Sequence, residues 1–421
     1  MERPVIDADR WPLVATTPDI RFASIRARRA EAAFAAACRK ANLSLSGDDP
    51  DLEVRVEDLF VRIAASGWVG LAESYMAEEW STPRLVSVVR GLLQAGYAPR
   101  TPHIGASPSS GGELPAELVR LYNPDPFGHQ GGIYSTGVPT TVRSSQRSYA
   151  RRGPAAHFVD ITQVSEPTAV DREDLAPALE RGARWLLNAA HVDAGTHTLV
   201  WPAAGAQAAV LAAQRNAVVD LVSADAATLQ VAREHMVLSG VADNVHCQLV
   251  DAAVPSRKQF RGRYDAIVSV GLFDTLNGRE RATYFGTLER LLAPQGRAVI
   301  HTAVATEALS PAARGALETL RAYVWPNAEL LTVDEVHKLA DRTSGLRIIE
   351  QRHTAAHAQE TLAQQRSFFA GKHREAAAAG FDSVYRRLWT FQLALREALL
   401  SLGMIDSVQF TAVHRNRHGR R

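Results

Sequence analysis

An acid and a histidine follow two predicted strands and could do chemistry together. Residues 264–270 form a continuous apolar run with Asp274 just beyond it, and His301 lies near the end of the apolar run 296–302. Parallel strands of an open α/β sheet end at the edge where ligands bind. A histidine and a carboxylate at this edge can hold an anion and supply a base. We therefore take Asp274 and His301 as candidate catalytic residues.

A turn earlier in the chain has the position of a cofactor loop but unusual residues. Residues 198–207 read Thr-Leu-Val-Trp-Pro-Ala-Ala-Gly-Ala-Gln, where a βαβ nucleotide-binding unit has its first strand and turn. Such a turn needs closely spaced glycines, because the backbone must approach the cofactor without interference from Cβ atoms. Gly205 is the one glycine here. The turn is either a packed strand–helix junction without a cofactor or a variant cofactor site.

The elements that position these residues alternate between strand and helix over 174–306. Apolar runs predict the strands and amphipathic runs predict the helices, so we expect a doubly wound, mostly parallel sheet of the Rossmann-like α/β class. The predicted strands are 198–201, 217–223, 245–251, 264–270 and 296–302, and the predicted helices are 175–190, 205–213, 226–238 and 279–292.

Helical segments flank this predicted core. Helical patterns over 20–45 and 51–97 predict a helical N-terminal domain at 1–97. Residues 98–155 are rich in Gly, Pro and Ser, so we expect 98–173 to be a partly disordered linker. Residues 307–421 are expected to form a mostly helical lid. Its last helix has an apolar stripe that includes Val384, Leu388 and Phe391, and a basic tail follows at 414–421.

Composition excludes several classes of protein. The 421 residues are 46% apolar and 22% charged, as in soluble globular proteins of two or three domains. A net charge of +2 argues against a nucleic-acid partner. The two cysteines lie far apart and no Cys/His cluster has zinc-ligand spacing, so we expect neither a disulfide scaffold nor a metal site. With no signal peptide or transmembrane run, we expect a cytoplasmic location.

Three stretches together carry a family likeness. The first is Gly70-Leu-Ala-Glu-Ser-Tyr-Met-Ala-Glu-Glu-Trp80, and the second runs from Tyr264-Asp-Ala-Ile-Val-Ser-Val-Gly-Leu-Phe-Asp274 to His301-Thr302. The third runs from Tyr323-Val-Trp-Pro326 through Glu360-Thr-Leu362 to Gln409-Phe410. With them the chain resembles the cyclopropane-fatty-acyl-phospholipid synthase and mycolic-acid/fatty-acid methyltransferase family, which has the class I methyltransferase fold. Within the first stretch, Glu73 and Tyr75 either pack internally or face lipid.

The resemblance implies chemistry on lipids. Members of this family use S-adenosylmethionine to methylate the double bond of an unsaturated phospholipid acyl chain, and a bound bicarbonate then removes a proton to close a cyclopropane. A related branch delivers a methyl branch, and some members work with a flavoprotein reductase. The acyl chain needs a dry apolar pocket, and the alternative role of the same bulky side chains is the core of the lid. The candidates for its walls are Tyr323, Trp325, Phe368, Phe369, Trp389, Phe391 and Phe410.

The cofactor turn departs from the family pattern, which has the style L-[DE]-I-G-x-G-W-G. Val200 stands at the acidic position, and Pro202 and Ala204 stand at two glycine positions, while Gly205 matches the tryptophan. Proline also removes a backbone N–H donor. These substitutions indicate that the contacts to the methionine end of the cofactor are lost.

Two polar residues match positions that contact ribose and adenine in methyltransferases. Ser223 ends the second predicted strand and Asp251 ends the third. Together with Gly205 they are the candidate cofactor-binding residues. For Asp251, capping of a following helix is the alternative.

The catalytic positions are partly kept. Asp274 matches a family glutamate that is one methylene longer, and His301 matches a histidine that helps to hold bicarbonate. The family's tyrosine before the Glu-Thr-Leu run is Ala358 here, so the neighbouring His357 is the candidate substitute. A family cysteine and an H-Y-D segment are expected within 125–165, but this range contains neither.

Two hypotheses follow. The first is a family member whose cofactor site has decayed and which binds lipid or serves as the subunit of an active paralogue or a flavoprotein reductase. The second is an active S-adenosylmethionine-dependent enzyme that adds a methylene or methyl group to unsaturated phospholipid acyl chains. An oxidoreductase is disfavoured because G-x-G-x-x-G is absent. Either protein would work peripherally on the inner membrane face, where the basic tail is solvated or contacts headgroups.

Overall fold

The computed structural model describes residues 6–103, 116–122, 131–135, 139–148, 157–168, 174–256, 259–260 and 262–415. They belong to two compact units. The first unit contains 1–106, 307–326 and 365–404, and the second contains 107–306, 327–364 and 405–421.

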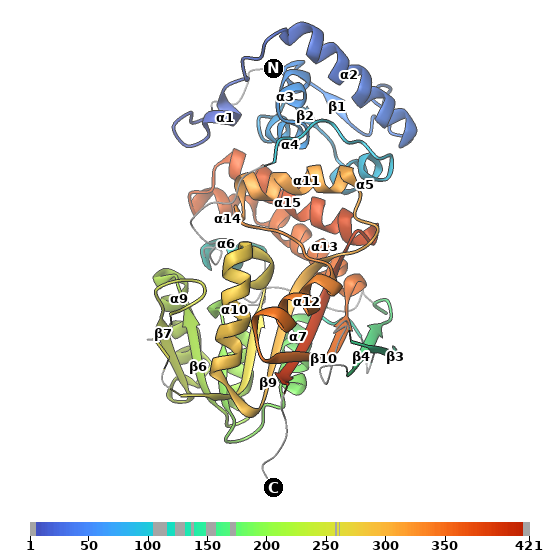
Figure 1. The fold of residues 1–421 in the computed structure, drawn as a ribbon. Coiled ribbons are helices and arrows are strands. Elements are labelled where there is room, and N and C mark those ends of the chain that lie inside the picture. The colour runs from blue at the N-terminus through green and yellow to red at the C-terminus, as the bar shows by residue number, and fades with distance from the viewer. Residues whose placement is uncertain are drawn as a thin grey trace. The chain divides into compact units, whose positions relative to one another are not determined.

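The first unit is a helical assembly around α15 (Ser383–Ser401), which contacts α4, α5 and α11. Most of the side chains of α15 are buried, as expected for a central helix. A short antiparallel pair, β1 and β2, joins the helices of the N-terminal part. The elements of this unit are α1 (Pro12–Ala15), α2 (Ala23–Lys40), β1 (Glu53–Val54), α3 (Asp58–Ser66), α4 (Trp68–Met76), β2 (Trp80–Ser81), α5 (Leu85–Gln94), α11 (Pro311–Tyr323) and α14 (His373–Ala378) (Figure 1).

Helices α3 and α4 cross closely because Gly70 has no side chain. A Cβ atom at Gly70 would lie 2.1 Å from the carbonyl oxygen of Arg62, so any other residue would separate the helices. Arg62 is itself almost fully buried and forms an ion pair with Glu79 at 3.0 Å. Its remaining nitrogens donate to the carbonyl oxygens of Leu13 and Val14, which fixes α1 on this core.

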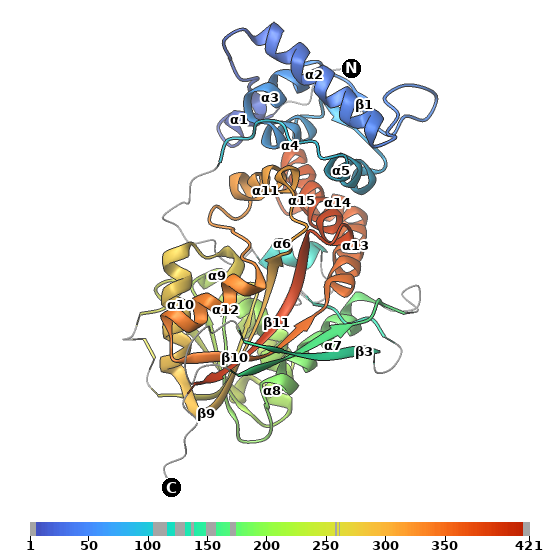
Figure 2. The ribbon, with the colours of Figure 1, turned by 45° about the vertical axis from the view of Figure 1, so that its right-hand side comes forward.

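The second unit contains a nine-stranded sheet in the order β3-β4-β10-β11-β9-β8-β5-β6-β7. The strands β9, β8, β5, β6 and β7 are mutually parallel, and β11 is antiparallel to both β9 and β10. The strands are β3 (Thr141–Arg147), β4 (Phe158–Val164), β5 (His197–Val200), β6 (Val218–Ser223), β7 (Val245–Leu249), β8 (Tyr264–Val270), β9 (Leu292–Ala305), β10 (Leu346–His353) and β11 (Ile405–His414). Figure 2 shows β10 and β11 between β3 and β9.

Helices cover both faces of this sheet. One buried cluster contains side chains of α7, α8 and α9, and another contains side chains of α10 and α12. The chain leaves β5 to form β6 on one side and later β8 on the other, so the sheet has its topological switch point at the end of β5. The helices of this unit are α6 (Ala116–Tyr122), α7 (Leu175–Ala189), α8 (Ala206–Gln214), α9 (Ala226–Leu238), α10 (Gly278–Leu291) and α12 (Val333–Thr343); α13 (Ala355–Gly371) begins here and ends in the first unit.

The predicted doubly wound sheet is confirmed, and the five strands predicted from apolar runs are β5 to β9. Within 98–173, which the sequence predicts to be a partly disordered linker, the structure has the regular elements α6, β3 and β4. Strand β3 reads TVRSSQR and has an almost entirely exposed pattern, so it lacks the apolar alternation that marks a strand. The segment 307–402 is mostly helical, as expected, but it also contains β10, which the sequence did not predict because its half-buried side chains are mixed with charged ones.

The segments that the sequence analysis called the lid do not form one body. Residues 307–326 and 365–404 belong to the helical unit, whereas 327–364 and 405–421 belong to the unit with the sheet. The expected stripe of α15 is buried, including Val384, Leu388 and Phe391. No helix within the described residues has both the length and the apolar character needed to cross a bilayer.

Candidate functional site

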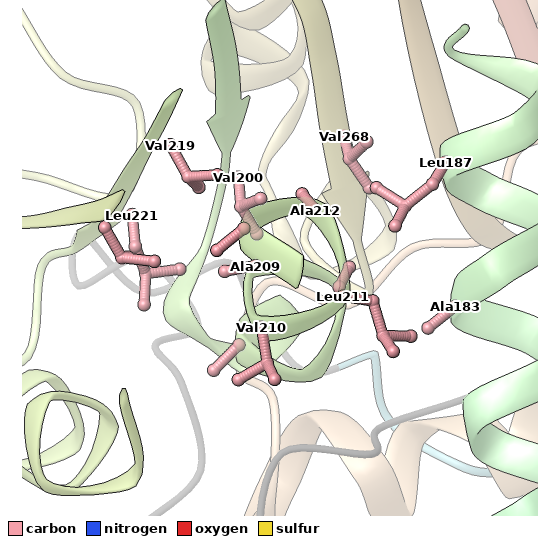
Figure 3. Packing of buried hydrophobic residues seen from close by; sticks show 14 of the residues in the cluster. Ala183, Leu187, Val200, Ala209, Val210, Leu211, Ala212, Val219, Leu221 and Val268 are labelled. Carbon is pink, nitrogen blue, oxygen red and sulfur yellow. The ribbon is translucent and has the colours of Figure 1, made fainter. Parts of the chain in front are cut away.

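The turn after β5 is packed into the core of the second unit. Val200 is completely buried within the cluster on the α8 face of the sheet, where it lies among Val219, Leu221 and Val268 (Figure 3). A Cβ atom at Gly205 would lie 2.9 Å from Cγ1 of Val200, closer than side chains pack. The glycine at this position therefore makes room for the valine side chain.

Two backbone donors of this turn are bonded within the protein. The Trp201 N–H donates to the carbonyl oxygen of Val268 at 2.9 Å, and the Gly205 N–H donates to that of Pro202 at 3.0 Å. Pro202 has no N–H to offer. A short 3-10 helix, η3 (Ala203–Gly205), closes the turn with its three residues buried. The amide groups of Trp201 and Gly205 thus donate to carbonyl oxygens of the chain itself.

Trp201 connects this turn to the loop after β7, a link that the sequence analysis missed. Its indole Nε1 donates to the carbonyl oxygen of Ala253 at 2.9 Å, and its ring centroid lies 5.0 Å from that of Tyr284. The side chain is almost fully buried. A tryptophan directly after an apolar strand was the available signal, because a buried indole N–H needs an acceptor.

Ser223, at the end of β6, bonds with its own loop. Its hydroxyl donates to the carbonyl oxygen of Asp225 and accepts from the Asp225 N–H, both at 2.9 Å. Asp225 caps α9 by accepting from the backbone and hydroxyl of Thr228. Partial burial raises the pKa of Asp225, but the bonds from Thr228 outweigh it and leave the pKa below its usual value. The side chains after β6 thus form a helix cap.

Asp251 is the most open of the predicted cofactor-binding residues. Its side chain is exposed, and its carboxylate accepts one long hydrogen bond from the Ser256 N–H at 3.4 Å. The backbone N–H of Asp251 donates to Gln259 at 3.1 Å. Because Ser256 lies in the irregular segment after β7, Asp251 organises this loop and still has a carboxylate oxygen that faces solvent.

His301 is buried in β9 and bonded to β11. One of its ring nitrogens, Nε2, lies 2.7 Å from the Ser407 hydroxyl, which is also 3.2 Å from the Thr354 hydroxyl. Its Nδ1 has no partner among the described residues. Burial lowers the pKa of His301 to about 4, so the ring is neutral near pH 7. A neutral imidazole with a free nitrogen can accept or pass a proton, provided that a group reaches it.

Asp274 and His301 bond to different partners. Asp274 lies in η5 (Phe273–Thr275) and accepts from the Thr302 hydroxyl at 3.2 Å. Side chains of successive strand residues point to opposite faces of a sheet, so Thr302 and His301 diverge. The preceding residues of β9 alternate in the same way, because Val299 belongs to the cluster on the α8 side and Ile300 to the cluster on the α10 side. The structure brings the two candidates to one end of β9, with different hydrogen-bond partners.

His357 holds two backbone segments in place. Its Nδ1 accepts from the Tyr134 N–H at 3.0 Å, so the proton is on Nε2, which donates to the carbonyl oxygen of Ser165 at 3.0 Å. The side chain is completely buried, and this burial lowers the pKa of His357. Both nitrogens are therefore engaged, and the ring has no free position for proton transfer as the side chain is arranged here.

The segment 131–135 reaches this site from the region that the sequence analysis assigned to a linker. A Cβ atom at Gly131 would lie 2.7 Å from Cε1 of His301, so its backbone covers the imidazole. Its carbonyl oxygen would lie 1.9 Å from a Cβ atom at Gly182 of α7. The Ile133 N–H donates to α7 at Ala178. The glycine pair at 131–132 and the glycine inside a predicted helix were the signals for this close approach.

Glu73 and Tyr75, the family-like residues of the first unit, are buried. Glu73 accepts from the Tyr323 hydroxyl at 2.6 Å, and burial raises the pKa of Glu73. The guanidinium of Arg387 lies 4.1 Å from the centroid of the Tyr75 ring. These contacts favour internal packing for both residues. Among the described residues, no three His, Cys, Asp or Glu side chains gather as a metal ion would require.

Most of the candidate aromatic residues belong to the helical unit. Phe369, Trp389 and Phe391 are buried there, and Tyr323 also contributes to a buried cluster with Leu388. Phe410 lies in the other unit, in the core of the sheet, where its ring packs edge-on against His337. Phe410 is thus a core residue of the sheet. The basic tail, apart from His414 and Arg415, falls outside the described residues.

Comparison with known proteins identifies relatives of both parts of the chain. The family model described as mycolic acid cyclopropane synthetase matches residues 167–410. Tuberculostearic acid methyltransferase UfaA1 of Mycobacterium tuberculosis is 27% identical in an alignment of 440 residues that covers 97% of this chain and 96% of that protein. The cyclopropane-fatty-acyl-phospholipid synthase of Escherichia coli K12 is 23% identical over 267 residues, 62% of this chain and 63% of that protein.

A solved structure supports the fold. Coclaurine N-methyltransferase, bound to N-methylheliamine and SAH, superposes with a TM-score of 0.56 at 12% identity. The match covers 83% of this chain and 99% of that one. At this identity the likeness concerns the fold, which is that of a class I methyltransferase.

Proposed function

Because the chain belongs to the mycolic acid cyclopropane synthetase family, we propose that it is a lipid-modification protein that binds unsaturated phospholipid acyl chains without transferring a methyl group. In this proposal it acts as a lipid-binding or partner subunit beside an active paralogue or a flavoprotein reductase. The observation that carries it is the packed turn after β5, in which Val200 is completely buried and Gly205 accommodates it.

The turn does not fit the methionine end of S-adenosylmethionine, the cofactor that the family uses. A buried valine occupies the place of the acid that would face the ammonium group, and Pro202 lacks the N–H of a glycine. The N–H groups of Trp201 and Gly205 are already bonded to carbonyl oxygens of the protein. Opening this turn would break these hydrogen bonds and leave the polar groups without partners. It would also expose the apolar side chain of Val200 to water. Both changes cost free energy.

In this proposal the residues around β9 have a role in packing and exclusion of water. His301 is neutral and covered by Gly131, and His357 holds the segment 131–135 through Tyr134. A bicarbonate ion would need open donors at this place, and the free Nδ1 of His301 is the one candidate that we assign to it.

The second candidate is an active methyltransferase or cyclopropane synthase acting on the same acyl chains. The observation in its favour is Asp251, whose exposed carboxylate lies after β7, where an adenine amine would bind. The full-length similarity to a tuberculostearic acid methyltransferase also favours it. This alternative requires that the turn after β5 rearranges when the cofactor binds.

Calorimetric titration with S-adenosylmethionine and with its demethylated product separates the two candidates. We expect no heat of binding from the full chain, whereas the Escherichia coli synthase in the same buffer serves as the positive control. Micromolar affinity would overturn the proposal. A matched titration with a monomeric unsaturated fatty acid should show saturable binding, and its absence would overturn the lipid-binding part.

A purification from the native host tests the partner. If the protein is a subunit, a catalytic paralogue or a reductase should be recovered with it in constant proportion. Recovery of the chain alone, together with turnover of unsaturated phospholipid by the purified protein, would support the active enzyme instead.

A further inference from the structure

Three large apolar side chains are exposed near the N-terminus of the helical unit. Leu13 of α1 is 65% exposed, Phe22 directly before α2 is 76% exposed, and Ile25 in the first turn of α2 is 54% exposed. Phe22 caps the start of α2 and Ile25 lies in its first turn, so the two exposed side chains are carried by the same end of this helix. We call these three exposed residues of the N-terminal segment 13–25 the apolar patch.

One residue of the apolar patch has a strained backbone conformation. Phe22 has φ = 58° and ψ = 40°, a left-handed conformation that a bulky side chain rarely adopts. Its ring gains no burial from this conformation, since three quarters of it remains exposed. At the other end of the patch, the buried guanidinium of Arg62 holds the carbonyl oxygen of Leu13 at 2.6 Å, so that α1 is fixed. Strain of this kind is typical of binding sites.

The segment that carries the apolar patch is rich in basic side chains. Residues 10–40 contain seven arginine or lysine residues and two acidic residues, although the whole chain carries a net charge of only +2. Arg21, Arg28 and Arg29 are exposed, and within the described part of the chain none of them has an ion-pair partner. Arg28 lies three residues after Ile25, on the same side of α2.

We propose that the apolar patch and these arginines dock the protein on a bilayer that contains anionic phospholipid. An interfacial helix inserts aromatic and aliphatic side chains at the boundary between headgroups and acyl chains, while arginines bind the anionic headgroups. Charge complementarity selects this occupant, because the same segment exposes large apolar side chains and arginines without ion-pair partners in the described structure. The inference deepens the proposed function and rests on it for the acyl-chain ligand, which this surface would bring within reach.

Vesicle sedimentation of the full chain tests the docking. Phosphatidylcholine vesicles are compared with vesicles that also contain phosphatidylglycerol, at low and high salt. We expect binding to the anionic vesicles that weakens with salt, because exposed charges are screened. The double variant Phe22→Ser/Ile25→Ser should reduce the partition coefficient by about tenfold or more. The variant Arg28→Glu/Arg29→Glu should reduce it by about tenfold as well.

Matched controls come from exposed residues outside the patch. Leu238→Ser removes a leucine that is 86% exposed on α9, and Arg374→Glu reverses an exposed arginine on α14. Neither should change the partition coefficient. Equal losses in patch and control variants, or equal binding to neutral and anionic vesicles, would overturn the proposal. Dimerisation or capture of an acidic protein through the patch, without vesicle binding, would also overturn it.

Binding of a monomeric unsaturated fatty acid distinguishes this inference from the proposed function. The patch variants should keep wild-type fatty-acid affinity and an unchanged Tm, while losing vesicle binding. If fatty-acid binding is absent but vesicle binding depends on the patch, the proposed function fails and the docking surface stands.

Discussion

Trp201 donates a hydrogen bond from its indole nitrogen to the carbonyl oxygen of Ala253 at 2.9 Å, and so fastens the turn after β5 to the loop after β7. Both segments border the edge of the sheet at which class I methyltransferases bind their cofactor. The bond lies in the core, where the tryptophan is 1% exposed. The contribution of this bond to the free energy of unfolding can therefore be measured.

The variant Trp201→Phe should destabilise the protein by about 1–3 kcal/mol, because it leaves a buried carbonyl oxygen without its donor. The free energy of unfolding from denaturant titration measures the loss. Trp325→Phe, in the other unit, is the comparison for loss of an indole, since Trp325 is only partly buried. If Trp201→Phe is as stable as the wild type, the bond to Ala253 contributes nothing and the turn is not fastened.

The variant Gly205→Ala should destabilise the protein by about 1–3 kcal/mol through overpacking against Val200. In the double variant Gly205→Ala/Val200→Ala the clash is absent, because the valine methyl groups are gone, so the loss should be smaller than the sum of the two single losses. A double-mutant cycle measures this coupling. Gly278→Ala is the matched control, since nothing lies within 4 Å of its Cβ position. An uncoupled cycle would contradict the packing of Gly205 against Val200.

Stability should fall in acid partly through His301. Burial lowers its pKa to about 4 in the folded chain, whereas an unfolded histidine titrates near 6.5. The unfolded state therefore binds more protons below pH 6.5, so the contribution of His301 is complete above this pH and is lost as the pH falls toward 4. The full loss is about 3 kcal/mol.

The comparison of wild type with His301→Gln isolates this term from the other histidines. The free energy of unfolding of the variant should decline less steeply between about pH 6.5 and pH 4.5. Equal slopes for the two proteins would show that the His301 ring is protonated as easily in the fold as in the unfolded chain.

The variant Tyr323→Phe should destabilise the helical unit by about 1–3 kcal/mol, because it removes the donor to the buried carboxyl of Glu73. Tyr97→Phe is a stringent control, since the buried hydroxyl of Tyr97 has no partner in the described structure and its removal should cost nothing. Thermal unfolding of the three proteins measures the difference. A Tyr97→Phe variant that is less stable than Tyr323→Phe would reverse the assignment.

The sequence predicts those parts of the fold in which apolar side chains have a clear period. Strands β5 to β9 and helix α9 are found where the sequence analysis expected them, because a parallel sheet covered on both faces needs continuous apolar runs. Strands β3 and β10 lack such apolar runs and were not predicted. They lie toward the opposite edge of the sheet, where only part of each strand is buried and partner strands supply the backbone hydrogen bonds.

The sequence predicts which residues lie at the candidate site, but it does not predict their hydrogen-bond partners. The sequence located Asp274 just after β8 and His301 near the end of β9, but it could not show that His301 bonds to Ser407 and Asp274 to Thr302. Nor could it reveal that His357 is saturated by backbone groups, because Tyr134 and Ser165 lie about two hundred residues away in the chain. Such partners depend on tertiary structure.

The helical unit is assembled from three separate pieces of the chain, and its central helix α15 comes last. When a ribosome has made α4 and α5, the helix against which they pack is still some three hundred residues away from synthesis. The apolar faces of α4 and α5 therefore stay exposed, or are bound by a chaperone, until nearly the whole chain has emerged and α15 can pack against them. Truncation before α15 should consequently prevent the N-terminal piece, residues 1–106, from folding, although its own sequence is intact.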